Sequence, residues 1–381
     1  MGSQEEKPIT GSKGGDDVVN GDVFQGWMAD GAGKPLRYTG FRVKEWEETD
    51  VDIAVECCGV CASDLHVLRS GWGETIYPCC VGHEIIGTAV RVGSHARPGI
   101  QIGDRVGIGP QGYTCRQADC EWCSSRQENY CPRRVGTYGD RYPNEKGISY
   151  GGFADHCRHN SYSVFSIPEA LDSASAAVML CAGSTVYEPL KEWGAGPETK
   201  VGVIGVGGLG HLGVLFAKAM GCPRVVAFSR KSDKTADAMK LGADEYVATS
   251  EQEDWSEKYA SSLDLIICTV SDPRMPFKEY LGLLRPKGRF CQVGIPEEPL
   301  PALDAMSLVL NGTSISFSDS ASPGNIREML ELAASKGIKA WTQVKPMKEV
   351  NEALKEMEEG KARFRIVLEN ESGGKPSSEG R

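Results

Sequence analysis

Five cysteines and two histidines fall within residues 55–84, "VECCGVCASDLHVLRSGWGETIYPCCVGHE". Thiolates and imidazoles are ligands that zinc prefers, and a catalytic zinc has three protein ligands and one open position. Cys61 and His83 are the best candidates here, because each lies in a glycine-containing turn beside an apolar, strand-like run. The third ligand should come from elsewhere. Cys181, in "MLCAGST", lies where a stretch of short strands gives way to alternating strands and helices. It would face the cleft between the two units that these stretches form.

A second group of cysteines has the spacing Cys115-x4-Cys120-x2-Cys123-x7-Cys131. Four thiolates so close in sequence can close a tetrahedral shell around zinc, which makes a site structural rather than catalytic. A four-cysteine ribbon can also bind nucleic acid, but acidic and basic residues are mixed here without a basic stripe. We therefore predict a structural zinc lobe at residues 110–132.

The other eight cysteines stand in strand-like or apolar settings, where a cysteine is more often a small buried residue than a ligand. We expect them in the core. They are Cys57, Cys58, Cys79, Cys80, Cys157, Cys222, Cys268 and Cys291.

A glycine-rich turn predicts a dinucleotide site. In "GVGGLG", Gly205, Gly207 and Gly210 follow an apolar strand and open a helix, with Gly208 and Leu209 between them. This is the context in which such a turn binds a pyrophosphate through backbone N–H groups at a helix N-terminus. An ordinary strand–turn–helix is the alternative.

The end of the next strand indicates which dinucleotide binds. An NAD site usually has Asp or Glu here to bond the ribose 2′-hydroxyl, whereas this chain has Ser229, Arg230 and Lys231. A hydroxyl and two cations suit a 2′-phosphate, which a carboxylate would repel. We therefore expect NADP(H). The alternative is that both cations are solvated surface residues.

These residues must be positioned by two kinds of unit. Short strands broken by Gly, Pro and Asp turns indicate a β-rich unit, and later apolar strands alternating with amphipathic helices indicate a parallel sheet covered on both faces. The final strand, "RFRIVLE", is expected to return to the first unit. The predicted domains are a disordered tail at 1–21, a β-rich catalytic domain at 22–181 completed by 320–370, a nucleotide-binding domain at 182–319, and a disordered tail at 371–381.

Composition excludes several classes of function. The chain of 381 residues has a formal net charge of −10 and a pI near 5.3, which argues against a nucleic-acid partner. No apolar run approaches the ~18–20 residues of a membrane span, and the N-terminus resembles neither a secretory signal nor a transit peptide. We expect a cytoplasmic protein with reduced cysteines and no membrane partner.

Six motifs occur in a family-specific order: "GVCASDLH", "GHEIIG", "GDRVG", the four-cysteine lobe, "MLCAGSTVY" and "GVGGLGHLG". In the order of these motifs the chain resembles the zinc-dependent medium-chain alcohol dehydrogenases. Within that family it resembles the cinnamyl alcohol dehydrogenase branch, especially the fungal and yeast NADP-dependent members of that branch. The likeness runs from about residue 22 to residue 370. It implies an α/β fold: a GroES-like β-rich catalytic domain plus a Rossmann domain with a doubly wound parallel sheet, usually in a homodimer.

The resemblance implies roles around the metal. Cys61, His83 and Cys181 would bind the catalytic zinc, Glu84 would lie near the metal and help ligand exchange, and Asp64 would orient His83 through its ring N–H. One departure concerns the structural lobe, in which the family usually spaces its first two cysteines by two residues, whereas four intervene here. A longer loop can still reach a shared ion.

The resemblance also implies roles beside the metal. Ser63 and His66 match the relay that carries the alcohol proton to solvent, although a serine and a histidine at a strand end can also be plain loop hydrogen-bonders. Thr185 matches a residue at the nicotinamide, and Trp72 matches an aromatic wall of the substrate pocket.

The predicted function is a zinc-dependent NADP(H) alcohol dehydrogenase or aldehyde reductase, with one catalytic and one structural zinc per chain. Its small-molecule substrate would be an aromatic or medium-chain aldehyde, for instance in secondary metabolism. One alternative is an imine, iminium or enone reductase of specialised metabolism on the same scaffold. Another is a non-catalytic dinucleotide-sensing protein.

Overall fold

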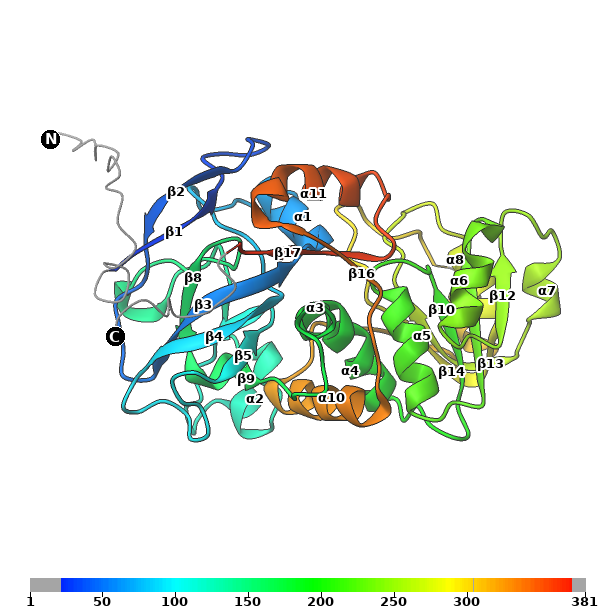
Figure 1. The fold of residues 1–381 in the computed structure, drawn as a ribbon. Coiled ribbons are helices and arrows are strands. Elements are labelled where there is room, and N and C mark those ends of the chain that lie inside the picture. The colour runs from blue at the N-terminus through cyan, green and yellow to red at the C-terminus, as the bar shows by residue number, and fades with distance from the viewer. Residues whose placement is uncertain (1–21, 304, 372–381) are drawn as a thin grey trace, which may run out of the picture.

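The computed structural model describes residues 22–303 and 305–371. The predicted tail at residues 1–21 lies outside these residues, as does the predicted C-terminal tail apart from Glu371. Two sheets stand at opposite ends of the molecule, with helices between them (Figure 1). No helix in the described part of the chain has the length and apolarity to cross a bilayer.

The first unit is built on a seven-stranded sheet whose main path runs β16-β17-β3-β4-β5-β9, with β8 paired to β3. Its last strand pairs antiparallel with β3, which confirms that the C-terminal strand returns to this unit. Its apolar side chains form one core with the N-terminal hairpin β1–β2. The strands are β1 Val23–Met28, β2 Arg37–Arg42, β3 Asp50–Gly59, β4 Ile85–Val92, β5 Arg105–Ile108, β8 His156–Asn160, β9 Val164–Ser166, β16 Thr342–Pro346 and β17 Arg365–Glu369.

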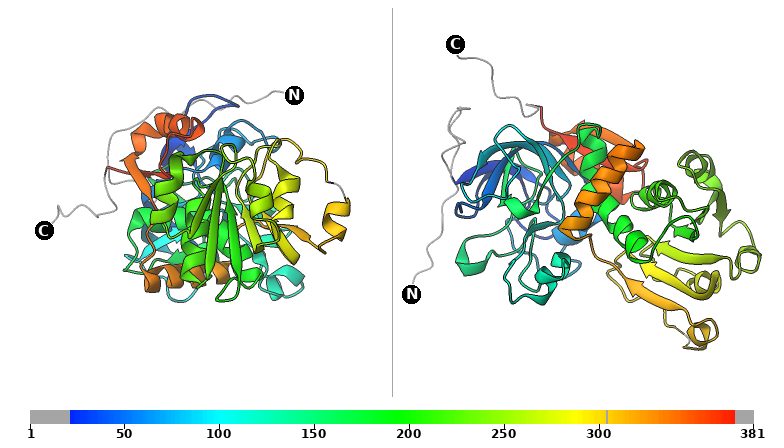
Figure 2. Two further views of the ribbon diagram at one scale, coloured as in Figure 1. Left: turned by 90° about the vertical axis from the view of Figure 1, so that its right-hand side faces the viewer. Right: turned by 90° about the horizontal axis from the view of Figure 1, so that it is seen from below.

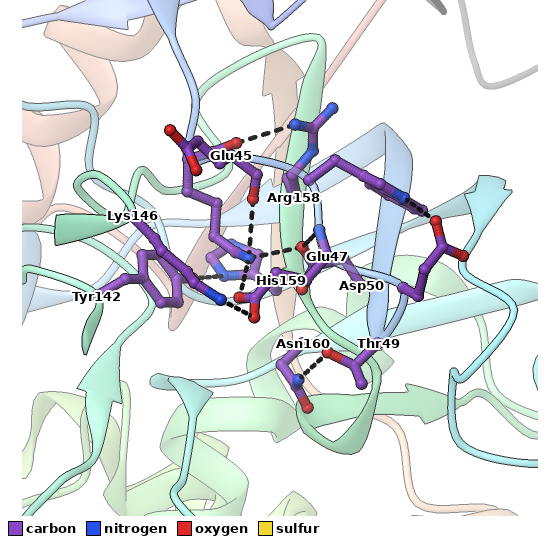
Figure 3. Close-up of polar contacts among 12 residues, drawn as sticks. Glu45, Glu47, Thr49, Asp50, Tyr142, Lys146, Arg158, His159 and Asn160 are labelled. Carbon is purple, nitrogen blue, oxygen red and sulfur yellow. Dashed lines mark hydrogen bonds and ion pairs between the residues drawn. The ribbon is translucent and has the colours of Figure 1, made fainter. Parts of the chain in front are cut away.

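A network of buried polar side chains holds the start of β3 (Figure 3). The Lys44 ammonium is 2.6 Å from an Asp50 carboxylate oxygen, and it also donates to Glu47. Both members of the Lys44–Asp50 pair are almost fully buried, and the pairing compensates for the water that each charge loses. Tyr142 contacts His159 of β8, whose pKa is lowered to about 3 by burial and by the Lys44 charge. None of these residues lines the cavity described below.

The second unit is a six-stranded parallel sheet in the order β12-β11-β10-β13-β14-β15. Along β11, Val225 and Ala227 belong to one apolar core, and Val226 and Phe228 belong to the other. Both faces are therefore covered, as the continuous apolar strands predict. The strands are β10 Lys200–Ile204, β11 Arg224–Ser229, β12 Glu245–Ala248, β13 Leu263–Cys268, β14 Leu284–Gln292 and β15 Ser314–Phe317.

Helices cover this sheet and separate it from the first unit (Figures 1 and 2). The segment between the two units contains a continuous helical run from Ser173 to Glu192, whose middle turn, η5 Met179–Gly183, is a π-helix. The helices between the sheets are α3 Ser173–Val178, α4 Ser184–Glu192 and α10 Pro323–Lys336. The other principal helices are α5 Gly210–Ala219, α6 Thr235–Lys240, α7 Trp255–Lys258, α8 Phe277–Gly282, α9 Ala305–Val309 and α11 Val350–Glu358. The two sheets are compatible with the predicted domain limits, which remain predictions.

Candidate active site

A cavity of about 320 Å³ opens between the two units. Residues of the loops next to strands of both sheets, together with residues of the helical segment between the sheets, line it. Among the residues predicted from the sequence, the lining includes Cys61, Ser63, His66, Trp72, His83, Cys181, Thr185 and Leu209. The fold thus brings together side chains that are distant in the sequence.

Cys61, His83 and Cys181 meet at the inner end of this cavity. Cys61 lies between β3 and α1 (Ala62–Leu68), His83 lies two residues before β4, and Cys181 belongs to the π-helical turn. Their ligand atoms and one oxygen of Glu84 all lie within 4.8 Å of one another. A π-turn widens a helix, and such turns occur frequently at functional sites. Two thiols, an imidazole and a nearby carboxylate form the donor set that suits zinc.

Asp64 joins the two loops that carry Cys61 and His83. Its buried carboxylate accepts hydrogen bonds from the Cys61 N–H at 2.8 Å and from the Gly82 N–H at 3.0 Å. Gly82 has φ +98°, and a Cβ there would lie 2.7 Å from the Phe153 ring. Only glycine therefore fits at the turn before His83.

The His83 ring is held by two groups. Its Nδ1 is 2.9 Å from the Tyr138 hydroxyl oxygen and 3.3 Å from an Asp64 oxygen, and its Nε2 is 3.0 Å from the Cys181 sulfur. A partner on Nδ1 leaves Nε2 to point at the thiols, as in most zinc-binding histidines. Asp64 lies where the sequence predicts a partner. Tyr138 was not predicted, and it also lines the cavity.

Glu84 is buried beside the three ligand candidates and pairs with Arg365 of β17. Burial raises the pKa of Glu84 to about 7, although the Arg365 charge opposes this effect. A Cβ on Gly59 would lie 2.0 Å from the Glu84 carboxylate, so a glycine is required there. One carboxylate oxygen of Glu84 is buried without a hydrogen-bond partner. An orphaned buried oxygen beside two thiols fits a site that holds a cation.

The two thiols of this group respond to each other. The hydrogen bond between Cys61 and Cys181 lowers the pKa of Cys61 and raises that of Cys181, and the Arg365 charge also stabilises the Cys61 thiolate. A site that already favours one thiolate is suited to a metal, because thiolates are the ligand form of cysteine.

Ser63, His66 and Trp72 also line the cavity, and they are more exposed than the three buried ligand candidates. The Ser63 Oγ is 3.6 Å from the Cys61 sulfur. The His66 ring stacks on Trp72, with ring centroids 4.4 Å apart and planes 21° apart. The His66 Nδ1 lies 2.5 Å from a Glu297 carboxylate oxygen, a contact that the sequence did not suggest.

The glycine turn opens at the same cavity. Gly205 has φ +89°, and a Cβ on Gly210 would lie 1.7 Å from the Gly205 carbonyl oxygen. By contrast, a Cβ on Gly207 would meet no atom within 4 Å, so the space that a pyrophosphate needs is open there. Leu209 of this turn and Thr185 of α4 both line the cavity. Gly208 packs near Arg365.

Ser229, Arg230 and Lys231 lie at the carboxyl end of β11, as predicted. Both cations are exposed. A third cation was missed: the Lys234 ammonium is 2.9 Å from the Val206 carbonyl oxygen of the glycine turn. Burial lowers the pKa of Lys234. The sequence shows that a lysine follows the strand at this position. It does not show that the Lys234 side chain points toward the glycine turn.

The four cysteines of the lobe converge in the structure. Cys115 Sγ lies 3.5 Å from Cys131 Sγ and 3.7 Å from Cys123 Sγ, and Cys120 Sγ lies 3.9 Å from Cys131 Sγ. A tetrahedron with zinc–sulfur bonds of about 2.3 Å has edges of about 3.8 Å. The four sulfur atoms therefore fit a zinc ion. The four residues between Cys115 and Cys120, where the family usually has two, still allow Cys115 to reach the other three cysteines. All eight cysteines expected in the core are buried.

Comparisons with known proteins agree with this architecture. Residues 47–169 match the alcohol dehydrogenase GroES-like domain, and residues 208–335 match the zinc-binding dehydrogenase family. The chain is 40% identical to NADP-dependent alcohol dehydrogenase 6 of Saccharomyces cerevisiae over 339 residues, which cover 88% of this chain and 92% of that protein.

Solved structures give the same result. A cinnamyl alcohol dehydrogenase from Sorghum bicolor has a TM-score of 0.86 at 35% identity, covering 91% of this chain and 97% of its own. A CAD from Helicobacter pylori, complexed with NADP(H), has a TM-score of 0.84 at 30% identity, covering 91% and 98%. The predicted GroES-like and Rossmann fold is confirmed. The chain therefore belongs to the zinc-dependent medium-chain alcohol dehydrogenases, in their cinnamyl alcohol dehydrogenase branch.

Proposed function

We propose that this alcohol dehydrogenase transfers hydride between NADP(H) and an aldehyde or alcohol at a zinc held by Cys61, His83 and Cys181. The observation that carries the proposal is the gathering of these donors in a cavity that the glycine turn also reaches. Zinc, when bound, supplies Lewis acidity to a carbonyl oxygen. Cys115, Cys120, Cys123 and Cys131 would hold the structural zinc.

The chain's own residues perform the remaining tasks. Asp64 and Tyr138 orient the His83 ring, and Arg365 balances the Glu84 charge beside the ligands. The Ser63 hydroxyl, next to Cys61, would hold the proton that the oxygen of the substrate exchanges. His66, farther out, would exchange a proton with solvent. General acid–base groups positioned in this way contribute about 10²–10⁴-fold in rate.

NADP(H) is supported as the cofactor by the end of β11 and by the named relatives. The end of the strand presents a hydroxyl and two exposed cations, which suit a 2′-phosphate. A carboxylate at this place would repel that phosphate. Lys234 adds a cation near the glycine turn. The cofactors are therefore zinc and NADP(H).

The substrate would be an aromatic or medium-chain aliphatic aldehyde. The cavity wall beyond the ligand group includes Trp72, Tyr138, Val293 and Ile295. These side chains suit an apolar or aromatic tail, whereas a heavily charged substrate would lose its water without finding a partner. A role in secondary metabolism and a cytoplasmic location remain predictions.

A homodimer joined through the nucleotide-binding domains is the proposed assembly. β15 is the last strand of its sheet, so one of its edges has no neighbouring strand among the described residues. Val309, Leu310 and Phe317, at and beside this strand, are large apolar residues with most of their surface exposed. A patch of this kind next to a free strand edge marks a protein interface.

The test of the reaction is a panel of aromatic, terpenoid and aliphatic aldehydes assayed with NADPH and NADH, with zinc measured on the same sample. We expect NADPH-dependent reduction and two zinc ions per chain. Cys61→Ala or His83→Ala should abolish turnover and leave NADPH binding nearly intact, because neither residue belongs to the glycine turn. Cys222→Ala, which removes a buried thiol outside both clusters, is the control.

The alternatives give different results in this panel. Reduction of imines or enones with no activity on aldehydes would favour the specialised reductase. NADPH binding without turnover on any compound would favour a dinucleotide sensor. Turnover that survives Cys61→Ala would contradict the assignment of the zinc ligands.

A further inference from the structure

One side-chain contact at the mouth of the cavity joins the two domains. His66 lies on α1 of the catalytic domain, and Glu297 lies in the loop after β14 of the nucleotide-binding domain. The His66 Nδ1 is 2.5 Å from the Glu297 Oε1, although the two residues are 231 positions apart. The His66 side chain is 24% exposed and that of Glu297 is 45% exposed, so the pair connects the cavity with solvent.

The surroundings fix both partners. Trp72 stacks on one face of the imidazole, which limits rotation of the ring. Gly71 provides the room for the carboxylate, since a Cβ at that position would lie 2.2 Å from the Glu297 Oε1. A side chain at position 71 would therefore compete with the Glu297 carboxylate for this space, and the glutamate would have to move.

The charge on Glu297 is not neutralised by a cation. Within residues 22–303 and 305–371, no lysine or arginine forms an ion pair with it, and His66 is its ion-pair partner. A guanidinium or ammonium would compete with the imidazole for the carboxylate oxygens. The Glu297 carboxylate is therefore left to accept the hydrogen bond of the His66 ring.

We propose that Glu297 is a positioning residue for His66 in the proton path, so that one domain supplies the histidine and the other supplies its carboxylate. This inference rests on the proposed function. In aldehyde reduction, one proton must enter from solvent for each hydride transferred. The His66 Nδ1–H donates to the Glu297 carboxylate throughout, while the His66 Nε2 takes a proton from an acid in solvent, such as hydronium or a buffer acid, and releases it toward the cavity. The Glu297 charge stabilises the imidazolium that forms between these two transfers. Charge and protons balance, and no electrons move in this part of the path.

The arrangement couples proton transfer to the position of the domains. The carboxylate reaches His66 only when the loop after β14 lies against α1, as it does here. The nicotinamide half of the cofactor would lie in the same interdomain cavity. The proton path through His66 is therefore complete in the domain arrangement that encloses the cofactor and the substrate.

Steady-state kinetics of Glu297→Gln and Glu297→Ala in the zinc-loaded enzyme test the proposal, and Glu298→Gln is the matched control. We expect kcat for aldehyde reduction to fall about tenfold or more in both variants, with NADPH affinity unchanged and a larger solvent deuterium isotope effect. Added formate should restore kcat of Glu297→Ala, because the small acid fills the vacated space, and it should not affect Glu297→Gln. Glu298→Gln should behave as the wild type.

A relocated carboxylate provides a second variant. Gly71→Asp combined with Glu297→Ala places an acid close to the position that the Glu297 carboxylate occupies, now from the catalytic domain. We expect this double variant to recover most of the lost rate. A purely structural role of Glu297 would give neither recovery nor rescue by formate.

A readout that needs no turnover separates this inference from the proposed function. Nitrogen-15 NMR of the His66 ring reports which nitrogen carries the proton, a choice set by the hydrogen bond that the ring makes. We expect the Nδ1–H form in the wild type and a shift away from it in Glu297→Ala. Unchanged kinetics and an unchanged tautomer in that variant would overturn the inference, whereas an inactive wild type with the expected tautomer would instead count against the proposed reaction.

Discussion

Single residues in this enzyme differ in what balances their charge. The Glu84 carboxylate is buried and faces Arg365, so its charge is compensated within the protein. Arg230 and Lys231 are exposed at the end of β11, where a ligand can approach them. A buried pair supports the structure of the site, while open cations at a strand end can select an anionic ligand.

Cofactor selectivity can be tested at one residue. Ser229→Asp puts a carboxylate where the 2′-phosphate would lie, so NADPH binding should weaken while the ribose hydroxyl of NADH gains an acceptor. The NADPH-to-NADH ratio of kcat/KM should fall by about 10–100-fold, since hydrogen bonds to charged groups are worth about 1.5–3 kcal/mol. Ser335→Asp adds the same charge on the exposed side of α10 and should leave the ratio unchanged. An unaltered ratio in Ser229→Asp would count against this cofactor site.

At the scale of elements, backbone geometry places the reactive groups. The π-helical turn carries Cys181 toward Cys61 and His83. The turn between β10 and α5 brings backbone close to backbone, because Gly210 packs against the Gly205 carbonyl. Neither arrangement depends on charged side chains, and the glycine turn has no room for a side chain at position 210.

Two glycines of α5 separate these effects. Gly210→Ala places a methyl group 1.7 Å from the Gly205 carbonyl oxygen, so the turn must open. We expect fluorescence titration to show a large loss of NADPH affinity, with zinc content unchanged. Gly213→Ala meets its nearest atom at 3.4 Å. It should keep NADPH binding and gain about 0.5–1 kcal/mol from helix propensity. Wild-type affinity in Gly210→Ala would contradict the pyrophosphate site.

At the scale of the whole molecule, the nucleotide-binding sheet ends in an edge strand with apolar neighbours. Leu310 is 77% exposed and Phe317 is 64% exposed. Isolated exposed apolar residues are ordinary, but several of them beside a free strand edge favour association of two sheets. The active-site cavity itself lies between the two domains of one chain.

Sedimentation velocity tests this assembly. Leu310→Glu with Phe317→Glu puts two charges in the proposed interface, where they would lose water without a partner, so the dimer should dissociate to monomers. Ile102→Glu changes an equally exposed apolar residue of the catalytic domain and should leave the dimer intact. A wild-type monomer, or a dimer that survives the double change, would contradict the proposed interface.

The sequence by itself determined the residue types, the motifs and the two kinds of unit. Cys61 and His83 stand out because of their glycine-containing turns, and Cys181 stands out because of its place between the two units. The parallel sheet follows from continuous apolar strands that alternate with amphipathic helices. The four cysteines of the lobe lie close in the chain, so their spacing alone indicated a shared ion.

Only the tertiary structure decided which distant side chains support the site. Tyr138 reaches His83 across 55 positions, Glu297 reaches His66 across 231, and Arg365 reaches Glu84 across 281. No local periodicity or turn signal distinguishes these three from ordinary surface or strand residues. A tyrosine, a glutamate or an arginine acquires its role here from the pairing of strands and the packing of two domains, which the short-range pattern of a single sequence does not encode.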